Sequence, residues 1–322
     1  MTTVLISVVS AKVDPIIDRF RRRGWEVKLS DIGPQSTEDE VIAELMGVDA
    51  TIATTEPYTR RVLESVDKLK IVARSGVGYD TIDVPAATER GIVVATTPGS
   101  NHKTVADYTV MAMLALTRKL LEAHRNVYTH RRFDRPTSHD FFGSTVGVIG
   151  TGAIGKQVIQ RVSAFECTVL ARDIVESPEI AALPNVTYVD LDGLLRGSDY
   201  VTVHVPSTPE TRHLIGEEEM SLMRPTAFLI NSARGPLVDE EAAFRAVRDK
   251  RIAGAALDVF EFEPLRPDSP LHDVEDVILT PHIAGVTVEA SDRANVMAAE
   301  SIVRVLSGEP PLSCVNPEVL NR

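Results

Sequence analysis

The sequence predicts an α/β protein with two domains, each formed by a parallel β-sheet that is doubly wound with helices. Three observations lead to this prediction. The chain has 322 residues, more than one typical domain contains. Short runs rich in Val and Ile alternate with segments of helical apolar period, which is typical of parallel sheets covered by helices. A glycine-rich turn at residues 150–155 also separates one such run from one such helix.

Composition and charge exclude several classes of function. Hydrophobic residues make up 43% of the chain and charged residues 25%, as in globular proteins that bury a sizeable core. The formal net charge of −12 argues against binding to nucleic acids or anionic membranes. No apolar run is long enough to span a membrane, and Thr3–Val9 is too short for a signal peptide. We therefore expect a cytoplasmic protein. The two cysteines, Cys167 and Cys314, lie in no CxxC pattern and near no histidine cluster, so neither a disulfide framework nor a metal site is expected.

The first hundred residues are predicted to form one βα domain. No GxGxxG follows any strand of this half, so it is not the dinucleotide binder. The predicted strands are Thr3–Val9, Trp25–Ser30, Ala50–Thr54, Lys70–Ser75 and Ile92–Thr96, and the predicted helices are Asp14–Arg23, Thr37–Met46, Thr59–Val66 and Val84–Arg90.

A connector follows. Thr97–Asn101 is a turn by composition. His102–Val127 is apolar on a helical period and contains neither Gly nor Pro, which predicts one long helix joining the two domains. Tyr128–Gly143 is polar, basic and irregular, and is interpreted as a surface loop.

The glycine-rich turn begins the second domain. A buried strand, Thr145–Ile149, precedes it, and a helix runs from Lys156 to Ala164. Gly150 permits the tight turn, Gly152 lets the backbone approach a pyrophosphate, and Gly155 lets the helix pack on the strand. The N-terminus of that helix offers free N–H groups to phosphates. These features predict a dinucleotide site.

An acidic residue at the right distance strengthens that prediction. The strand Thr168–Ala171 leads to Asp173, which lies 23 positions after Gly150. Dinucleotide-binding units place a carboxylate here to bind the adenosine ribose hydroxyls. The alternative is an ordinary βαβ turn with a solvated Asp. The order strand, glycines, helix, strand and acid favours the dinucleotide site, and the acid favours NAD.

Further strands of this half each lead into polar residues, at the edge where open α/β sheets bind ligands. Arg234 follows one strand, Asp258 and Glu263 lie at the end of the next, and His282 follows the third. His204 is interpreted as lining a pocket. The predicted strands are Tyr200–Val205, Ala227–Ser232, Gly254–Val259 and Val277–Thr280, and the predicted helices are Gly216–Met223, Asp239–Arg251 and Thr287–Leu306.

Taken singly, Arg234 is as readily a structural ion pair, and a lone histidine is more often a hydrogen-bonded structural residue. Together, Arg234, Glu263 and His282 suit hydride transfer to a 2-keto acid. That reaction needs a cation for the substrate carboxylate, a proton donor for the developing alkoxide, and a carboxylate that keeps the donor charged.

The sequence resembles the D-isomer-specific 2-hydroxyacid dehydrogenases from about Val48 to Asn316, and the order and spacing of the shared blocks make the resemblance specific. The blocks are Gly76–Asp80, Thr97–Asn101, Val148–Gly155, His204–His213, Asn231–Asp239, Ala255–Phe260 and Thr280–Gly285. The resemblance implies that Arg234, Glu263 and His282 are catalytic and that Val77, Gly78, Asn101 and Arg234 bind substrate. The cofactor contacts it implies, with those expected from the glycine turn and the strand ends, are Gly150, Gly152, Ala153, Ile154, Gly155, Asp173, His204, Val205, Pro206, Ser232, Ala233, Arg234, Asp258, His282, Ala284 and Gly285.

The resemblance also implies an organisation. Residues 1–100 and 288–322 would form a flavodoxin-like substrate-binding domain, and residues 101–287 a Rossmann NAD-binding domain, with the active site between them. A homodimer is expected, with the connector helix and the nearby loop in its interface. Asp107 and Phe133 replace the family's usual Glu and Trp in that region, and Arg172 replaces a frequent aromatic residue, which leaves room for NADP.

Several functions remain open at this stage. The first is an NAD-dependent dehydrogenase acting on a small D-2-hydroxy acid and its 2-keto acid. Phosphoglycerate dehydrogenase is an alternative, although its usual arginine after Ala50–Thr54 is absent and the nearest basic residue is Arg60. A non-catalytic NAD-sensing regulator is an alternative of another class. Formate dehydrogenase is disfavoured, because it carries glutamine where this chain has Glu263.

Overall fold

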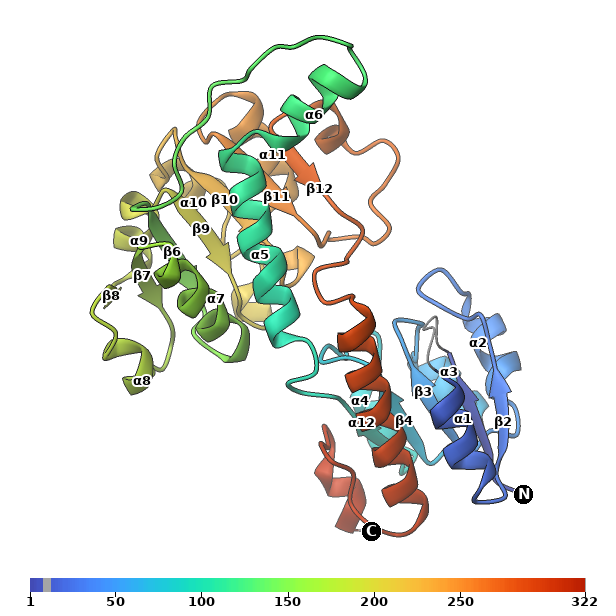
Figure 1. Cartoon of the computed structure of the whole chain (residues 1–322). Coiled ribbons are helices and arrows are strands. Elements are labelled where there is room, and N and C mark those ends of the chain that lie inside the picture. The colour runs from blue at the N-terminus through green and yellow to red at the C-terminus, as the bar shows by residue number, and fades with distance from the viewer. Residues whose placement is uncertain (8–12, 322) are drawn as a thin grey trace. The chain divides into compact units, whose positions relative to one another are not determined.

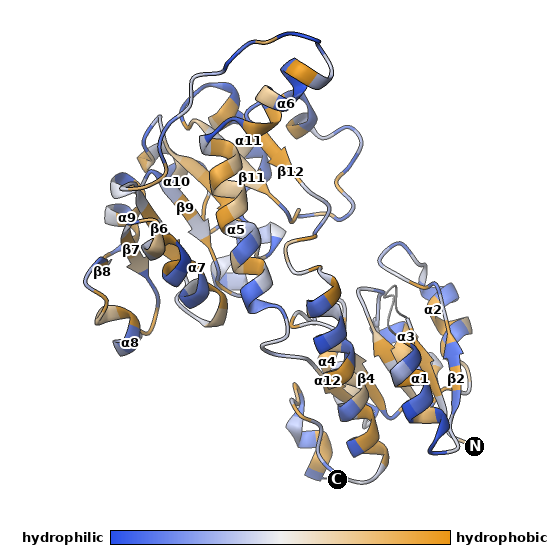
Figure 2. Cartoon of the chain, viewed as in Figure 1, coloured by the Kyte–Doolittle hydropathy of each residue, from blue (hydrophilic) through white to orange (hydrophobic). Residues whose placement is uncertain are grey.

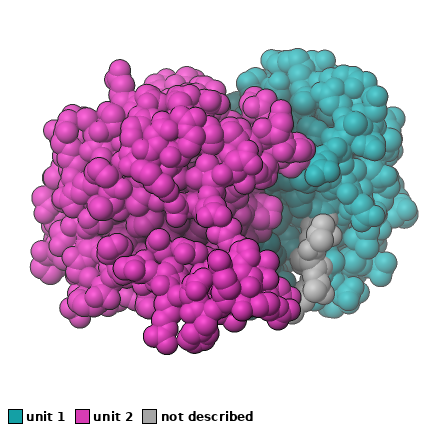
Figure 3. Space-filling model, turned by 90° about the horizontal axis from the view of Figure 1, so that it is seen from above, with its two compact units in different colours: residues 1–101, 286–322 teal, residues 102–285 magenta. Residues whose placement is uncertain are grey.

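A computed structural model describes residues 1–7 and 13–321. The chain divides into two compact units, Met1–Asn101 with Val286–Arg322, and His102–Gly285 (Figure 3). Each unit contains one parallel sheet, as the sequence predicts. Val8 and Val9, the end of the first predicted strand, lie outside the described residues.

The sheet of the first unit has five strands in the order β2-β1-β3-β4-β5, all parallel. All five predicted strands and the four predicted helices of this half are confirmed, each within a few residues. Its strands are β1 Thr3–Ile6, β2 Glu26–Leu29, β3 Ala50–Ala53, β4 Ile71–Arg74 and β5 Val93–Ala95, and its helices are α1 Asp14–Arg21, α2 Glu38–Leu45, α3 Arg60–Ser65, α4 Val84–Glu89, α12 Val288–Leu306 and the 3₁₀ helix η4 Pro317–Asn321.

Residues from the C-terminal part of the chain complete this unit. Helix α12 packs on β3 and β4 (Figure 1), and its Ala298 and Ile302 lie in the same hydrophobic cluster as β1, β3 and β4. The amide of Asn316 then closes the edge at β5. Its Oδ1 accepts from the Val94 N–H at 2.8 Å, and its Nδ2 donates to the Ile92 carbonyl at 2.9 Å. These bonds satisfy backbone groups that an edge strand would otherwise leave unpaired.

The sheet of the second unit has seven parallel strands in the order β12-β11-β10-β9-β6-β7-β8. Its strands are largely hydrophobic, whereas the segment that follows α6 is mostly hydrophilic (Figure 2). The strands are β6 Thr145–Ile149, β7 Thr168–Arg172, β8 Val186–Tyr188, β9 Tyr200–Val203, β10 Phe228–Asn231, β11 Gly254–Leu257 and β12 Val277–Leu279. The helices are α5 His102–Thr117, α6 Leu120–Tyr128, α7 Ala153–Ala164, α8 Pro178–Ala181, α9 Leu191–Gly197, α10 Glu217–Leu222 and α11 Glu240–Arg248, with 3₁₀ helices η1 Pro209–Thr211, η2 Gly235–Leu237 and η3 Pro270–Asp273.

The single long connector helix is a wrong prediction. Lys119 adopts a left-handed conformation with φ of 46°, so α5 ends at Thr117 and α6 begins at Leu120. The physical reason lies in the apolar period. Leu116 is buried, but Leu120 and Leu121 are 57% and 47% exposed, so the apolar residues of α6 do not continue the buried face of α5.

The segment between β7 and β9 holds elements that the sequence did not predict, namely β8, α8 and α9. Strand β8 has three residues and α8 has four, too few to display a period of either kind. Helix α9 is longer, and the Asp190 side chain caps it by accepting from the Gly193 N–H at 2.8 Å.

Candidate active site

The glycine turn has the geometry that a dinucleotide site needs. Gly150 adopts φ of +92°, and a Cβ there would lie 2.5 Å from the His204 carbonyl oxygen. A Cβ on Gly155 would lie 1.9 Å from the Gly150 carbonyl oxygen, so only glycine lets α7 approach β6 this closely. A Cβ on Gly152, by contrast, would meet nothing within 4 Å. That position is the N-cap of α7, where open space beside free N–H groups suits a pyrophosphate.

The carboxylate of Asp173 lies beside this turn. It accepts from the Thr151 N–H at 2.6 Å and hydroxyl at 2.9 Å, and from the Ile174 N–H at 2.7 Å. Partial burial raises the pKa of Asp173, but these donors outweigh it and hold the pKa below its usual value. The ionised side chain is therefore suited to accept hydrogen bonds from ribose hydroxyls. The guanidinium of Arg172 donates to the Asp173 carbonyl oxygen.

His282 and Glu263 are in direct contact. His282 Nδ1 lies 2.7 Å from Glu263 Oε2, and the side chains are 42% and 34% exposed. The other Glu263 oxygen accepts from the Phe260 N–H at 3.1 Å. Burial raises the pKa of Glu263, but the His282 hydrogen bond and charge, the Phe260 N–H and the Arg234 charge together lower it. Because an ionised carboxylate only accepts, the His282 proton in this contact lies on Nδ1.

Asp258 supports the turn that carries His282. Its Oδ1 accepts from the Ile283 N–H at 2.9 Å, and its Oδ2 accepts from the Ala284 N–H at 2.8 Å. Its carbonyl oxygen accepts from the His282 N–H at 2.8 Å. Burial raises the pKa of Asp258, although these donors and the nearby His282 oppose the rise. Both carboxylate oxygens are therefore engaged by the turn.

Arg234 lies at the start of η2, just after β10. Its Nη1 donates to the Ala233 carbonyl at 2.6 Å, while Asn231 Nδ2 donates to the Arg234 carbonyl at 2.9 Å. A Cβ on Gly235 would lie 1.9 Å from the Phe260 carbonyl carbon, so this loop and the one after β11 pack backbone against backbone. Arg234, Glu263 and His282 thus follow three neighbouring strands, β10, β11 and β12, at one edge of the sheet.

His204 follows β9 at the same edge. Its Nε2 lies 2.9 Å from Thr202 Oγ1, and its Nδ1 is buried without a hydrogen-bond partner among the described residues. Burial lowers the pKa of His204 to about 3, so the ring is neutral at physiological pH. The other predicted cofactor residues lie at this edge too: Ala153 and Ile154 begin α7, Val205 and Pro206 follow β9, Ser232 and Ala233 follow β10, and Ala284 and Gly285 follow His282.

The predicted substrate residues other than Arg234 lie in the first unit. Val77 and Gly78 follow β4, and Asn101 lies beyond β5, the strand paired with β4. The two loops are joined by the Thr97 N–H, which donates to the Gly76 carbonyl at 3.0 Å. Val77 is 42% exposed, so this loop lies at the surface.

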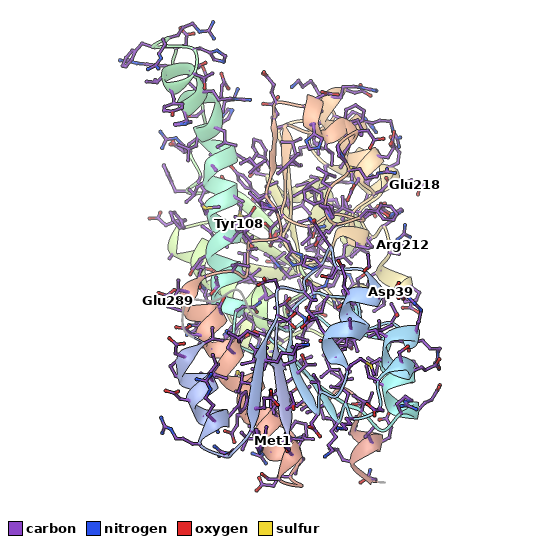
Figure 4. The ribbon with its side chains drawn as sticks, turned by 90° about the vertical axis from the view of Figure 1, so that its right-hand side faces the viewer. Met1, Asp39, Tyr108, Arg212, Glu218 and Glu289 are labelled. Carbon is purple, nitrogen blue, oxygen red and sulfur yellow. The ribbon has the colours of Figure 1, made fainter. Side chains whose placement is uncertain are left out.

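Sequence reasoning missed several residues that build the site. Thr151 binds Asp173, and its place between two turn glycines was a usable signal. Thr280 donates to Asp258 at 2.6 Å, and it lies two residues before His282. Tyr108 lies on α5 (Figure 4), and its hydroxyl contacts Thr280. It gave no signal, because an aromatic residue on an amphipathic helix is normally a core residue. Within residues 1–7 and 13–321, no three His, Cys, Asp or Glu side chains gather as a metal site, and no helix is apolar and long enough to cross a membrane.

Comparison with known proteins identifies the family. Residues 110–284 match the NAD binding domain of the D-isomer specific 2-hydroxyacid dehydrogenases. A glyoxylate reductase of Thermofilum pendens is 42% identical over 292 residues, which cover 88% of this chain and 86% of that protein. A D-3-phosphoglycerate dehydrogenase of Methanocaldococcus jannaschii is 39% identical over 309 residues, which cover 94% of this chain but only 58% of that protein. The structure of D-lactate dehydrogenase from Aquifex aeolicus, complexed with NAD and lactic acid, superposes with a TM-score of 0.83 at 28% identity, over 99% of this chain and 98% of that one. The chain belongs to the D-isomer specific 2-hydroxyacid dehydrogenases and is an NAD-dependent enzyme of that family.

Proposed function

We propose that this enzyme interconverts small 2-keto acids and D-2-hydroxy acids, with His282 as its acid/base catalyst. The observation that supports this most directly is the 2.7 Å contact between His282 Nδ1 and Glu263 Oε2, at the sheet edge that also carries Arg234 and the glycine turn. Bound NADH supplies the hydride that reduces the keto carbon. The side chains of the protein then have to supply the proton and bind the substrate carboxylate.

The proton passes through the outer nitrogen of the His282 ring. Because Glu263 accepts from Nδ1, Nε2 is the ring nitrogen that faces substrate. In reduction, the imidazolium donates its Nε2 proton to the substrate oxygen as the carbonyl becomes an alcohol, and the ring is left neutral. In oxidation, the neutral ring removes the same proton. The lowered pKa of Glu263 keeps it a carboxylate through both directions, so it stabilises the charged form of the ring.

Arg234 binds the substrate carboxylate through its planar fork. In the first unit, the Val77 and Gly78 amides and the Asn101 side chain are the groups proposed to bind substrate. Residues 1–101 and 286–322 are accordingly the substrate-binding part of the chain, and residues 102–285 the NAD-binding part.

The substrate is a small or moderately polar acid, with 3-phosphoglycerate as the runner-up. A buried carboxylate, Glu56, follows β3 in the first unit and accepts from the Thr54 N–H at 2.9 Å and the Tyr58 hydroxyl at 3.1 Å. A phosphate bound beside that strand end would meet negative charge. Of the basic residues nearby, Arg60 pairs with Glu89 at 2.6 Å and Arg61 with Glu38 at 2.9 Å, so each is already engaged by an acid.

Steady-state NADH oxidation with a panel of 2-keto acids tests this function. Glyoxylate, hydroxypyruvate and pyruvate should be reduced efficiently. Phosphohydroxypyruvate, or 3-phosphoglycerate in the oxidative direction, should show a lower kcat/KM. A kcat/KM for the phosphorylated pair that exceeds the others by about tenfold would make phosphoglycerate dehydrogenase the function. Activity with no member of the panel, despite NADH binding, would favour the NAD-sensing regulator.

NAD should be preferred over NADP because the ionised Asp173 repels a 2′-phosphate. Asp173→Ala should narrow the ratio of kcat/KM for NADH to that for NADPH, whereas Glu176→Ala should leave the ratio unchanged. Glu176 is the matched control, since it is an exposed acid of the same loop. Equal efficiency with both cofactors in the unmodified enzyme would contradict the assignment and point to Arg172 as a phosphate ligand.

The enzyme is proposed to be a homodimer that buries the face formed by α5, α6 and α7. A groove of about 590 Å³ on this face is lined by apolar side chains such as Met111, Leu114 and Phe165, and Met111 is 50% exposed. Exposed apolar side chains gathered on one face are typical of a protein contact. Light scattering should give a dimer, which Met111→Asp should convert to a monomer. Leu29→Asp is the control, because Leu29 is 59% exposed on β2 of the other unit.

A further inference from the structure

We propose that Tyr108 is a positioning residue for His282, acting through Thr280 and Asp258 on the turn that carries the histidine. The proposal rests on the acid/base role of His282 proposed above and adds a residue from α5, which packs on α7, β10 and β11. All four residues belong to the second unit.

The hydrogen bonds form one continuous series, and the donor of each bond is defined. Thr280 Oγ1 donates its only proton to Asp258 Oδ1 at 2.6 Å. The Tyr108 hydroxyl contacts the same Oγ1, and it must therefore be the donor in that contact. Burial raises the pKa of Tyr108 to about 12, so the phenol keeps this proton at physiological pH. Each donor in the chain polarises the next, which strengthens the bond that Thr280 makes to Asp258.

Asp258 connects these hydrogen bonds to the turn that carries His282. Its side chain is fully buried, and its two oxygens accept from the N–H groups of Ile283 and Ala284, the two residues after His282. His282 itself adopts φ of 53°, a left-handed conformation that is unfavourable for a residue with a Cβ. Hydrogen bonds from the N–H groups of this turn to Asp258 keep it in this conformation. Removal of the Tyr108 hydroxyl should make the Asp258 carboxylate more mobile. The His282 ring should then be held less firmly beside Glu263.

A second tyrosine provides a matched control. Tyr200 begins β9, and its hydroxyl lies 2.6 Å from Oγ1 of Thr117, also on α5. Thr117 donates its own proton to the Met113 carbonyl at 2.6 Å, so Tyr200 is the donor to Thr117, just as Tyr108 is to Thr280. Both phenols are nearly buried, with 3% and 8% exposure. The two series of hydrogen bonds end differently, that of Tyr200 at the Met113 carbonyl and that of Tyr108 at the Asp258 carboxylate.

The test compares Tyr108→Phe with Tyr200→Phe in the full-length enzyme. Each variant loses one buried donated hydrogen bond, so both should lower the unfolding midpoint in urea by similar amounts. Tyr108→Phe should in addition lower kcat about three- to tenfold with KM for the keto acid nearly unchanged, whereas Tyr200→Phe should keep kcat within about twofold. Thr280→Val should lower kcat at least as far, and Thr280→Ser, which keeps the hydroxyl, should recover most of that loss.

A second readout does not depend on turnover. In ¹⁵N-histidine-labelled protein without cofactor, the ring ¹⁵N shifts of His282, assigned by their absence in His282→Ala, report which nitrogen carries the proton. Tyr108→Phe should reduce the Nδ1–H form and Tyr200→Phe should not. Equal kcat losses in both tyrosine variants, or unchanged His282 shifts in Tyr108→Phe, would overturn the positioning role. A fully active His282→Ala would instead refute the proposed catalytic role, and the ¹⁵N comparison would still decide the positioning.

Discussion

The carboxyl edges of the two sheets carry different chemistry, although both sheets are parallel and wound in the same way. In the second unit, the loops after β10, β11 and β12 hold Arg234, Glu263 and His282, all ionisable, and Glu263 is bound to His282. In the first unit, the loops after β4 and β5 present a backbone segment around Gly78 and the neutral side chain of Asn101. The buried acid beside them, Glu56, is satisfied by its own neighbours.

The difference shows how one feature of the fold can serve either proton transfer or binding. A parallel sheet brings successive loops together at one edge whatever their composition. Where the loops carry charged groups in contact, the edge can move protons. Where they carry amides, the edge can only bind. We therefore expect substitutions in the second unit to change kcat and those in the first unit to change KM.

The largest effect should come from His282→Ala. Loss of a general acid lowers kcat by ~10²–10⁴, and KM should change little because the histidine does not hold the carboxylate. Steady-state NADH oxidation measures it. His272→Ala is the control, since that side chain is exposed and its Nε2 lies 3.2 Å from the Arg266 carbonyl oxygen. If His282→Ala retained near-full kcat, the proton would come from another group. The proposed difference between the two sheet edges would then be wrong.

Arg234→Ala should come next and should affect both kinetic constants. If the guanidinium binds the substrate carboxylate as proposed, it does so in the ground state and the transition state alike, so KM should rise and kcat should fall. Arg234→Lys keeps the charge without the fork and should recover only part of the loss. The measurement is kcat and KM with glyoxylate. A change confined to KM would move Arg234 from the catalytic group to the binding group.

Asn101→Ala tests the first unit. Removing one neutral hydrogen-bonding side chain should raise KM for the keto acid by about tenfold and leave kcat nearly unchanged. Ser100→Ala is unsuitable as a control, because Ser100 is buried against Thr97 at 3.3 Å, so Thr81→Ala in an exposed loop of the same unit is preferred. A fall in kcat as large as that of Arg234→Ala would show that the first unit takes part in the chemical step.

Glu263→Gln should shift a pH profile rather than abolish activity. The pKa of Glu263 is lowered in the folded enzyme, so the carboxylate is ionised at neutral pH and offers His282 Nδ1 a negatively charged acceptor. The amide cannot, and the reductive activity should fade at lower pH than in the unmodified enzyme. The profile of reductive kcat between pH 5 and 9 checks this. If the alkaline limb of the kcat profile did not move, the contact between Glu263 and His282 would only orient the imidazole ring.

His204 should make the second unit sensitive to acid. Burial lowers the pKa of His204 from its ordinary value of 6.5 to about 3, so between these pH values the unfolded chain binds a proton that the folded chain does not. The stabilisation is complete above pH 6.5 and is lost as pH falls toward 3, amounting to about 2 kcal/mol at pH 5. His204→Asn should reduce the difference in urea-unfolding free energy between pH 7.5 and pH 5. Equal acid sensitivity in both proteins would assign the effect to other groups.

Local patterns accounted for much of the fold. The glycines at 150, 152 and 155, the acid at 173 and the alternation of strands and helices each depend on a few neighbouring residues, and the structure has the turn, the carboxylate and both parallel sheets where these patterns place them. The predictions of secondary structure failed where a local pattern was too short or too ambiguous to indicate an element. Strand β8 and helix α8 offer three and four residues, and the helix break at Lys119 involves neither glycine nor proline.

The sequence by itself determined the two-sheet architecture, the dinucleotide turn and the residue types at the strand ends, because backbone propensity and apolar period are written into consecutive residues. Only the tertiary structure decided which side chains meet. The contact between Glu263 and His282 spans 19 positions, and the chain from Tyr108 through Thr280 to Asp258 spans far more. Such contacts depend on the register of strands and on how α5 packs, and no local pattern encodes either, because packing is settled by the whole core at once.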